Sequence, residues 1–174
     1  MEPQKLFSSI PKHCQGGHYA TLTLEEKKAI INYRRQKAYD SLNEVEALTQ
    51  LAFWNLAGNR LYYAVYHMAS ALLLDKGFSA RTHSGVIHLI GQNFITKGFL
   101  DKSYGRLFTR LFDLRQSGDY DDLYDATEEE IIPLIDKTKS FIKEMEGKER
   151  MGNAFFVGAF FRQGGERKKT ESGQ

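Results

Sequence analysis

Apolar side chains recur along residues 23–146 at the spacing of an α-helix, and no part of this region alternates as a half-buried strand would. Up to about residue 50, one clean apolar stripe faces a charged side. This stripe consists of Ile31, Ala38, Leu42, Val45 and Leu48. A second set of positions mixes apolar and polar side chains and forms no clean stripe: Ile30, Tyr33, Lys37, Asp40, Ser41 and Glu44. The pattern predicts an amphipathic helix.

Capping signals and glycines divide the region into five predicted helices. Thr23 with Glu26 and Thr127 with Glu130 have the spacing of a capping box at a helix start. Glycines that suit a helix end follow the second and third segments. The predicted helices are 23–50, Phe53–Lys76, His83–Lys97, Tyr104–Gln116 and one that begins at Thr127. We therefore predict an all-α fold.

The segment Phe53–Lys76 is apolar nearly all round, with Arg60 as the first of its few charges. A helix of this kind is normally buried on every side. We therefore expect it at the centre of the fold. We also expect the chain to form a homodimer, because such a helix needs neighbours around its whole circumference.

Three zones differ in composition. Residues 1–20 contain Gly, Pro and Ser without periodicity and are expected to form a flexible N-terminal arm. Residues 21–146 hold the predicted helices, and residues 147–174 are expected to form a flexible, Gly-rich, basic tail. The apolar segment Phe155–Phe161 of this tail is either a docking segment for a partner groove or an exposed aggregation hazard.

The 174 residues carry a net charge of only +2, so a nucleic-acid surface would have to be a local feature. The single cysteine, Cys14, excludes an internal disulfide framework and a multi-cysteine zinc site. The sequence contains neither the apolar run of a secretory signal nor one long enough to span a membrane. We therefore expect a cytoplasmic protein that does not enter the membrane.

Three segments, in the same order and spacing, resemble the HEPN domain family (higher eukaryotes and prokaryotes nucleotide-binding). The first is Asn59-Arg60-Leu61-Tyr62-Tyr63-Ala64-Val65-Tyr66-His67-Met68-Ala69. The second is Thr82-His83-Ser84-Gly85-Val86-Ile87, and the third is Leu111-Phe112-Asp113-Leu114-Arg115-Gln116-Ser117-Gly118-Asp119-Tyr120. The resemblance covers about 120 residues and implies an antiparallel bundle of four to five helices over residues 21–146.

Members of this family usually pair as homodimers, which the resemblance therefore implies for this chain. Many relatives act with a small nucleotidyltransferase as a toxin–antitoxin pair. Some are metal-independent ribonucleases that use an arginine and a histidine four to six residues apart. The resemblance thus implies either a module that binds RNA, a nucleotide or a nucleotidyltransferase partner, or an endoribonuclease. A small-ligand or nucleotide-binding helical protein without an RNA role is a third interpretation.

Arg60 and His67 are the candidate catalytic pair. Seven helical steps of about 100° bring the two side chains to within about 20° of each other, two turns apart. An arginine can hold a phosphate with two hydrogen bonds, and a histidine can transfer protons near neutral pH. This pair would suit RNA cleavage without a metal. Alternatively, both side chains are polar groups that find partners inside the bundle.

Arg115 is a second candidate for binding RNA or a nucleotide, because active relatives carry their arginine and histidine late in the domain. Four residues separate Arg115 from Tyr120, which stands where such a relative places histidine. With a pKa of about 10, tyrosine transfers protons poorly at neutral pH. This substitution favours a binding module over a nuclease. An ion pair with Asp119 is the structural alternative for Arg115.

Arg81, His83 and Ser84 lie at the expected start of the third helix and are further candidates for binding a nucleotide or RNA. The amides that are not hydrogen-bonded at a helix start favour an anion such as phosphate. The alternative is that Ser84 only caps the helix. The acidic stretch Gly118–Ala126 has the composition of a calcium loop but not its ligand pattern. We expect neither a metal nor a cofactor.

Overall fold

The computed structural model describes residues 22–120 and 125–151, and every regular element in them is a helix. In order, the elements are α3 (Leu24–Gln50), α4 (Trp54–Asp75), α5 (His83–Ile90), the π-helix η1 (Gly91–Ile95), α6 (Lys102–Tyr120) and α7 (Glu128–Arg150). The predicted all-α fold is confirmed. The predicted N-terminal arm, nearly all of the C-terminal tail and residues 121–124 of the acidic stretch lie outside the described residues.

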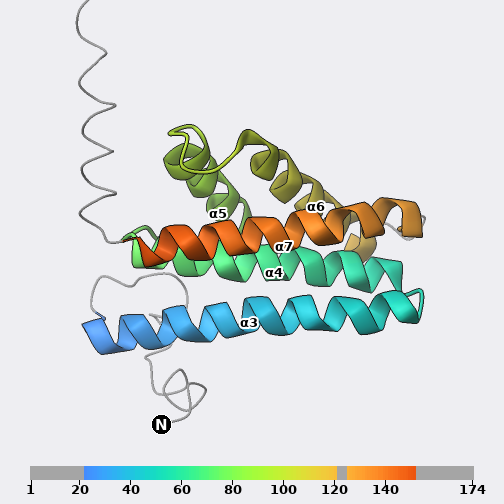
Figure 1. The fold of residues 1–174 in the computed structure, drawn as a ribbon, viewed down its shortest axis with the longest axis horizontal. Coiled ribbons are helices and arrows are strands. Elements are labelled where there is room, and N and C mark those ends of the chain that lie inside the picture. The colour runs from blue at the N-terminus through green and yellow to red at the C-terminus, as the bar shows by residue number, and fades with distance from the viewer. Residues whose placement is uncertain (1–21, 121–124, 152–174) are drawn as a thin grey trace, which may run out of the picture.

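Helices α3, α4 and α7 lie side by side along the length of the molecule, and α5 and α6 pack on another side of α4 (Figure 1). Helix α3 runs antiparallel to α4, whereas α7, which follows α6 along the chain, runs parallel to α4 (Figure 1). Contacts at both ends show this, because Asn55 lies next to Asp125 while Lys76 lies next to Glu149. The structure is therefore the antiparallel helix bundle that the sequence leads us to expect.

Helix α4 occupies the centre, as its apolar composition predicts. It contacts α3, α5, α6 and α7 and buries residues along its whole length. The four largest fully buried side chains come from four different elements and are Tyr62, Phe94, Phe108 and Phe141. The neighbours that this helix needs are thus supplied within one chain. A homodimer remains a prediction, because the burial of α4 does not require it.

The predicted helix starts are correct in atomic detail. The side chain of Thr23 accepts a hydrogen bond from the Glu26 amide at 3.2 Å, and the Glu26 carboxylate accepts one from the Thr23 amide at 2.8 Å. The same capping box opens α7 at Thr127. The two glycines expected after the second and third helices, Gly77 and Gly98, have φ of 82° and 73°. Only glycine adopts this backbone conformation without strain.

The predicted helix His83–Lys97 is confirmed as helical up to Ile95, but its second half is not an α-helix. The α-helix ends at Ile90 and continues as a π-helix to Ile95. Both the amide and the hydroxyl of Thr96 donate to the carbonyl of Gly91, at 2.9 Å each. This wider turn accommodates an additional residue, as π-helical turns do. Helix α6 is longer than predicted at both ends, and the Asp101 carboxylate caps its start by accepting from the Ser103 amide at 2.7 Å.

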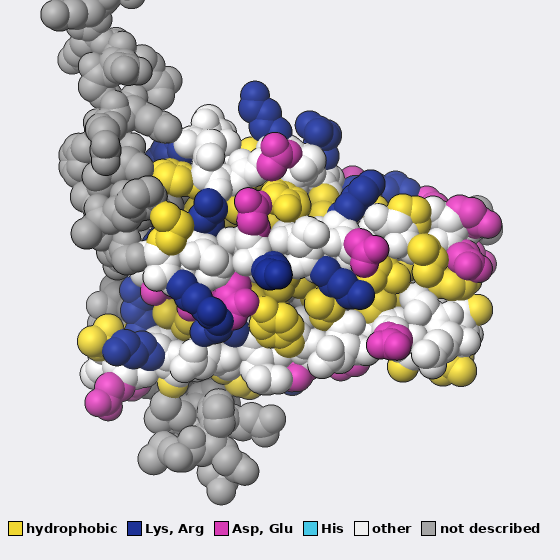
Figure 2. All heavy atoms as spheres, viewed as in Figure 1, with side chains coloured by type: hydrophobic (Ala, Val, Ile, Leu, Met, Phe, Trp, Pro, Cys, Tyr) yellow, Lys and Arg dark blue, Asp and Glu magenta, His cyan; other side chains and the backbone are white. Residues whose placement is uncertain are grey.

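The outer face of α3 and α7 carries Lys and Arg side chains interspersed with Asp and Glu (Figure 2). This face shows no continuous patch of one charge, in keeping with the small net charge of the chain. Among the described residues, no helix combines the length and the apolar character that a membrane crossing needs.

The end of α7 is anchored to the end of α4 by a buried lysine. The Lys76 side chain is 1% exposed, and its Nζ lies 2.8 Å from the Asp75 carboxylate. It also donates to the carbonyls of Glu149 at 3.1 Å and Met151 at 2.6 Å. Residues 147–151 therefore take part in packing, although the tail is predicted to begin at residue 147.

We expect a chain that ends after residue 146 to be less stable by about 1–3 kcal/mol, because the buried ammonium of Lys76 loses two of its acceptors. A chain that ends after residue 153 keeps both carbonyls and should unfold like the whole chain. The free energies of unfolding of the three chains, measured in urea, test this expectation. Equal values for the two shortened chains would contradict a stabilising role of this anchor.

Candidate functional site

Arg60 and His67 lie on the same side of α4, as their spacing predicts, and both line one pocket. The pocket has a volume of about 250 Å³ and lies between α3 and α4. The other lining residues are Lys37, Asp40, Ser41, Glu44 and Tyr63. Polar side chains from α3 thus face the candidate pair.

The two candidates have different surroundings. The Arg60 guanidinium lies 3.3 Å from the Glu44 carboxylate and donates to the Asn59 side chain at 3.2 Å. It also lies 5.6 Å from the centre of the Tyr63 ring. The His67 ring stacks against Tyr63, with centroids 6.0 Å apart, and meets the Tyr66 ring edge-on at 5.5 Å. Arg60 is therefore an ion-paired group at the pocket, whereas His67 is enclosed by aromatic rings.

His83, from the first turn of α5, joins the same aromatic cluster. Its Nδ1 is 2.6 Å from the hydroxyl of Tyr62, and its ring stacks on Tyr66 with centroids 4.4 Å apart. The edge of His83 also meets Tyr63 at 6.1 Å. The three tyrosines of α4 therefore connect His67 to His83, although the two histidines belong to different helices.

Arg115 reaches this cluster from α6. Its guanidinium carbon lies 5.9 Å from the ring centres of both Tyr62 and Tyr63. A guanidinium at this distance from an aromatic ring is attracted by the ring's electrons. The structure thus brings together four of the six predicted site residues around Tyr62, Tyr63 and Tyr66. These four are Arg60, His67, His83 and Arg115.

The cluster has a positive local potential. Burial is the main cause that lowers the pKa of His67 to about 4, and Arg34, Lys37, His83 and Arg60 lower it further by repelling a proton. Burial, followed by the charge of Arg115, also lowers the pKa of His83. Asp40 and Glu44 line the same pocket and offset part of this charge. At pH 7 the His67 imidazole is therefore neutral, in surroundings that favour an anion.

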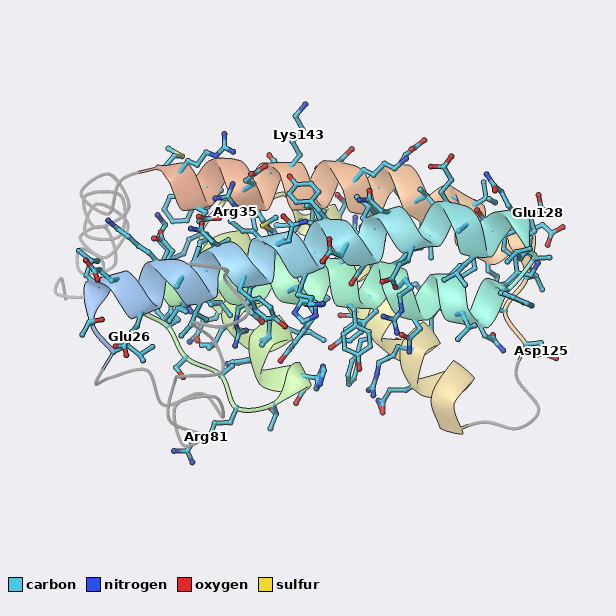
Figure 3. The ribbon with its side chains drawn as sticks, turned by 90° about the horizontal axis from the view of Figure 1, so that it is seen from below. Glu26, Arg35, Arg81, Asp125, Glu128 and Lys143 are labelled. Atoms are coloured by element: carbon cyan, nitrogen blue, oxygen red, sulfur yellow. The ribbon has the colours of Figure 1, made fainter. Side chains whose placement is uncertain are left out.

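Arg81 and Ser84 do not join the cluster in the same way. Both are exposed, and Figure 3 shows Arg81 on the outer side of α5, directed away from the bundle. Thr82, not Ser84, caps α5, since its hydroxyl oxygen accepts from the Gly85 amide at 3.0 Å. The alternative interpretation of Ser84 as the cap is therefore wrong. The side chains of Asp119 and Tyr120 lie outside the described residues, so the comparison at Tyr120 remains a prediction.

Several residues of the site were missed as candidates. Lys37, Asp40 and Glu44 belong to the mixed set of positions on the first helix, which forms no apolar stripe. Their helical spacing, which places these polar residues along one side of the helix, is the sequence signal that could have identified them. The tyrosines of α4 looked like core residues, although Tyr63 and Tyr66 are only partly buried. Among residues 22–120 and 125–151, no group of three or more His, Cys, Asp or Glu side chains could hold a metal ion.

Residues 31–148 match the family model described as the HEPN domain. The chain belongs to the HEPN domain family. A UPF0332 protein of Thermotoga maritima is 36% identical over 123 residues, covering 71% of this chain and 93% of that protein. A protein of Methanocaldococcus jannaschii named "Putative toxin MJ0605" is 33% identical over 122 residues, covering 70% of this chain and 87% of that protein. The family predicted from the three sequence segments is confirmed.

The matched region begins at Ile31, within α3, and runs through α4, α5, η1 and α6 to residue 148, near the end of α7. The cluster around the three tyrosines therefore lies within the HEPN domain. Figure 3 shows α5 and α6 diverging from one side of α4, with nitrogen-bearing side chains gathered between them. In chemical terms, this arrangement offers guanidinium groups for phosphates and partly exposed aromatic rings for bases.

Proposed function

We propose that this HEPN domain binds RNA or a nucleotide through the cluster formed by Arg60, His67, His83 and Arg115, and that it acts in a toxin–antitoxin-like pair. The observation that carries the binding proposal is the convergence of these four side chains, from α4, α5 and α6, on three neighbouring tyrosines. Their places in the sequence are up to 55 residues apart, as the numbers of Arg60 and Arg115 show.

The chemistry of the cluster supports an anionic, aromatic ligand. Arg60 and Arg115 each lie within 6 Å of the Tyr63 ring, at 5.6 and 5.9 Å. Arginines of this kind can pair with phosphates while the rings stack on bases, and stacking tolerates different base sequences. The cations that, after the larger effect of burial, lower the pKa of both histidines add to the attraction for phosphate. The cluster therefore suits single-stranded RNA or a nucleotide.

Metal-independent RNA cleavage by Arg60 and His67 is the second candidate, favoured by the fact that both residues line one pocket. Such cleavage needs one group that accepts a proton and one that donates it. With a pKa of about 4, the His67 imidazole is neutral at pH 7 and has no proton to donate as an imidazolium. This favours binding over cleavage in the state described.

The toxin–antitoxin part of the proposal rests on the relatives. Two proteins of Methanocaldococcus jannaschii that this chain resembles, at 33% and 31% identity, are named as putative toxins. We propose that the chain forms a homodimer and that its partner is a nucleotidyltransferase, as the resemblance to the family implies. We also propose that it works in the cytoplasm, where RNA and such a partner are available.

The experiment that tests this function measures RNA binding and RNA cleavage together, in a chelator and without added metal. We expect the wild-type protein to bind single-stranded RNA and leave it intact. His67→Ala should lower the free energy of unfolding by about 1–3 kcal/mol, because the ring packed between Tyr63 and Tyr66 is lost. Fluorescence anisotropy, gel analysis of the RNA and thermal melting give the three readouts.

The possible outcomes separate the two candidates. Cleavage by the wild-type protein that His67→Ala abolishes, with melting unchanged, would establish the nuclease and exclude a purely binding role. Absence of both binding and cleavage would reject the RNA function, whatever the stability of the variant. His88→Ala is the matched control, since His88 is an exposed histidine of α5 and not part of the cluster.

A further inference from the structure

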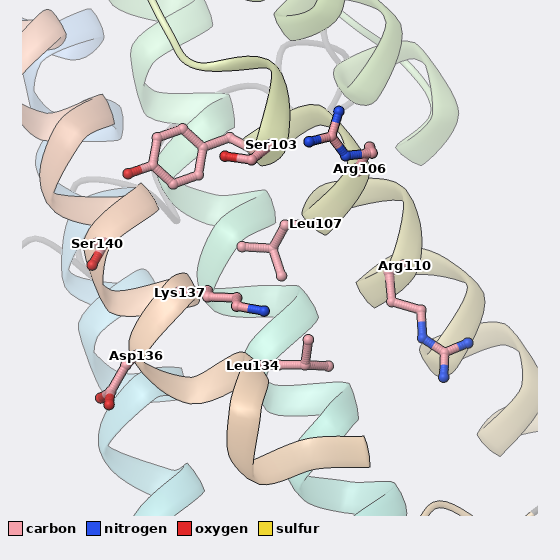
Figure 4. A pocket seen from close by; sticks show the side chains of 9 residues that line it. Ser103, Arg106, Leu107, Arg110, Leu134, Asp136, Lys137 and Ser140 are labelled. Atoms are coloured by element: carbon pink, nitrogen blue, oxygen red, sulfur yellow. The ribbon is translucent and has the colours of Figure 1, made fainter. Parts of the chain in front are cut away.

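A second groove lies between α6 and α7, on residues that the cluster around the tyrosines does not use. It has a volume of about 630 Å³, which is within the range of small-molecule sites. Arg106 and Arg110, one turn apart on α6, line one wall, and Lys137 on α7 lines the other (Figure 4). The two walls thus present cationic side chains to the same space.

The charges of the groove favour an anion. Its lining contains three cations and one carboxylate, that of Asp136, whose side chain is 96% exposed. Arg110 is ion-paired with Glu130. The pKa of Asp101 is lowered mainly by hydrogen bonds from Ser103 and, to a smaller extent, by the positive charge of Arg106. Arg106 and Lys137, on facing helices, are therefore the principal candidates to hold a phosphate group.

The rest of the lining can hold a less polar group. Figure 4 shows Leu107 and Leu134 between the cationic side chains, one from each helix. Tyr104, also in the lining, stacks on Phe141 at 4.5 Å between ring centroids, which fixes its ring. Ser103 and Ser140 add hydroxyls to the lining. This combination of cations, hydroxyls and apolar side chains resembles that of ligand sites, where a few polar groups orient a ligand.

We propose that the α6–α7 groove binds a phosphorylated small ligand, with its phosphate between Arg106 and Lys137 and its less polar part against Leu107 and Leu134. Phosphate prefers such a pair because charge-assisted hydrogen bonds are stronger than neutral ones. The site is separate from the cluster around the tyrosines and does not depend on the function proposed for it.

The test measures binding of ATP and of pyrophosphate to the full-length protein by calorimetry. Arg106→Gln and Lys137→Gln should each weaken ATP binding about tenfold, because each removes one charge-assisted contact. Lys28→Gln is the matched control, as it removes one positive charge from an exposed position on α3. It should leave the affinity for ATP unchanged.

A single-stranded RNA oligonucleotide is the third probe, since its backbone offers the same phosphate chemistry. RNA that displaces ATP from the wild-type protein, but binds Arg106→Gln more weakly, would identify the backbone as the source of the phosphate and support the site. Equal affinities for ATP in the wild type, Arg106→Gln and Lys137→Gln would overturn the proposal. So would the failure of all three probes to bind saturably.

Discussion

Lowering the pH from 7 to 4 is expected to cost about 3 kcal/mol of unfolding free energy through His67 alone, because its pKa is about 4 in the folded protein and about 6.5 in an unfolded chain. Between these two values the unfolded chain binds a proton that the folded chain does not. Protonation therefore favours unfolding as the pH falls through this window. Above about pH 7.5 both states are neutral and the contribution is zero.

His67→Gln isolates this contribution, because carboxylates that also titrate in this range are common to both proteins. The difference in unfolding free energy between His67→Gln and the wild type should shift by about 3 kcal/mol in favour of the variant from pH 7 to pH 4. The measurement is urea unfolding at several pH values. His88→Gln, at an exposed position of α5, should follow the wild type.

A pH dependence that is the same in His67→Gln and the wild type would mean that the imidazole titrates alike in both states. It would contradict the enclosed environment formed by Tyr63 and Tyr66 and the repulsion by Arg34, Lys37, Arg60 and His83. Asp40 and Glu44 face the same pocket, and their negative charges act against the repulsion of a proton by the cations. The experiment thus measures the net potential of the site.

Most of the fold is predictable from the sequence because local signals and burial agree. The capping boxes at Thr23 and Thr127 and the glycines after two helices mark real helix boundaries. The apolar circumference of Phe53–Lys76 predicts the central position of α4. The π-helical turn at Gly91–Ile95 is not predictable in this way, since it depends on Thr96 bonding to Gly91 rather than on any hydrophobic period.

The site is only partly predictable, because helical spacing relates residues of one helix and not residues of different helices. It correctly places Arg60 and His67 on one side of α4. It cannot show that Arg115 of α6 and His83 of α5 meet the same tyrosines, which depends on how the helices cross. Arg81, which comes just before the start of α5 in the sequence, is directed outward instead (Figure 3).

Replacing both arginines of the cluster should have the largest effect on RNA binding. Arg60→Gln and Arg115→Gln are each expected to weaken binding of single-stranded RNA about tenfold at low salt, and the double variant about a hundredfold. The hundredfold loss assumes that each arginine contacts its own phosphate, so that the losses in binding free energy add. Because both side chains lie against Tyr63, arginines that share one phosphate would give a smaller loss in the double variant. Fluorescence anisotropy of the four proteins forms the double-mutant cycle.

Salt dependence tells direct phosphate contacts from indirect effects. Each arginine that contacts a phosphate should, when replaced, lower the slope of log affinity against log salt by about 0.7 for a single strand. Arg81→Gln should change neither quantity, because Arg81 lies on the outer side of α5, and Lys139→Gln on α7 controls for net charge. Thermal melting must show that the double variant is folded, which we expect because Glu44, the partner of Arg60, is 53% exposed and remains hydrated. Affinities and slopes unchanged in the folded double variant would place RNA binding elsewhere on the protein.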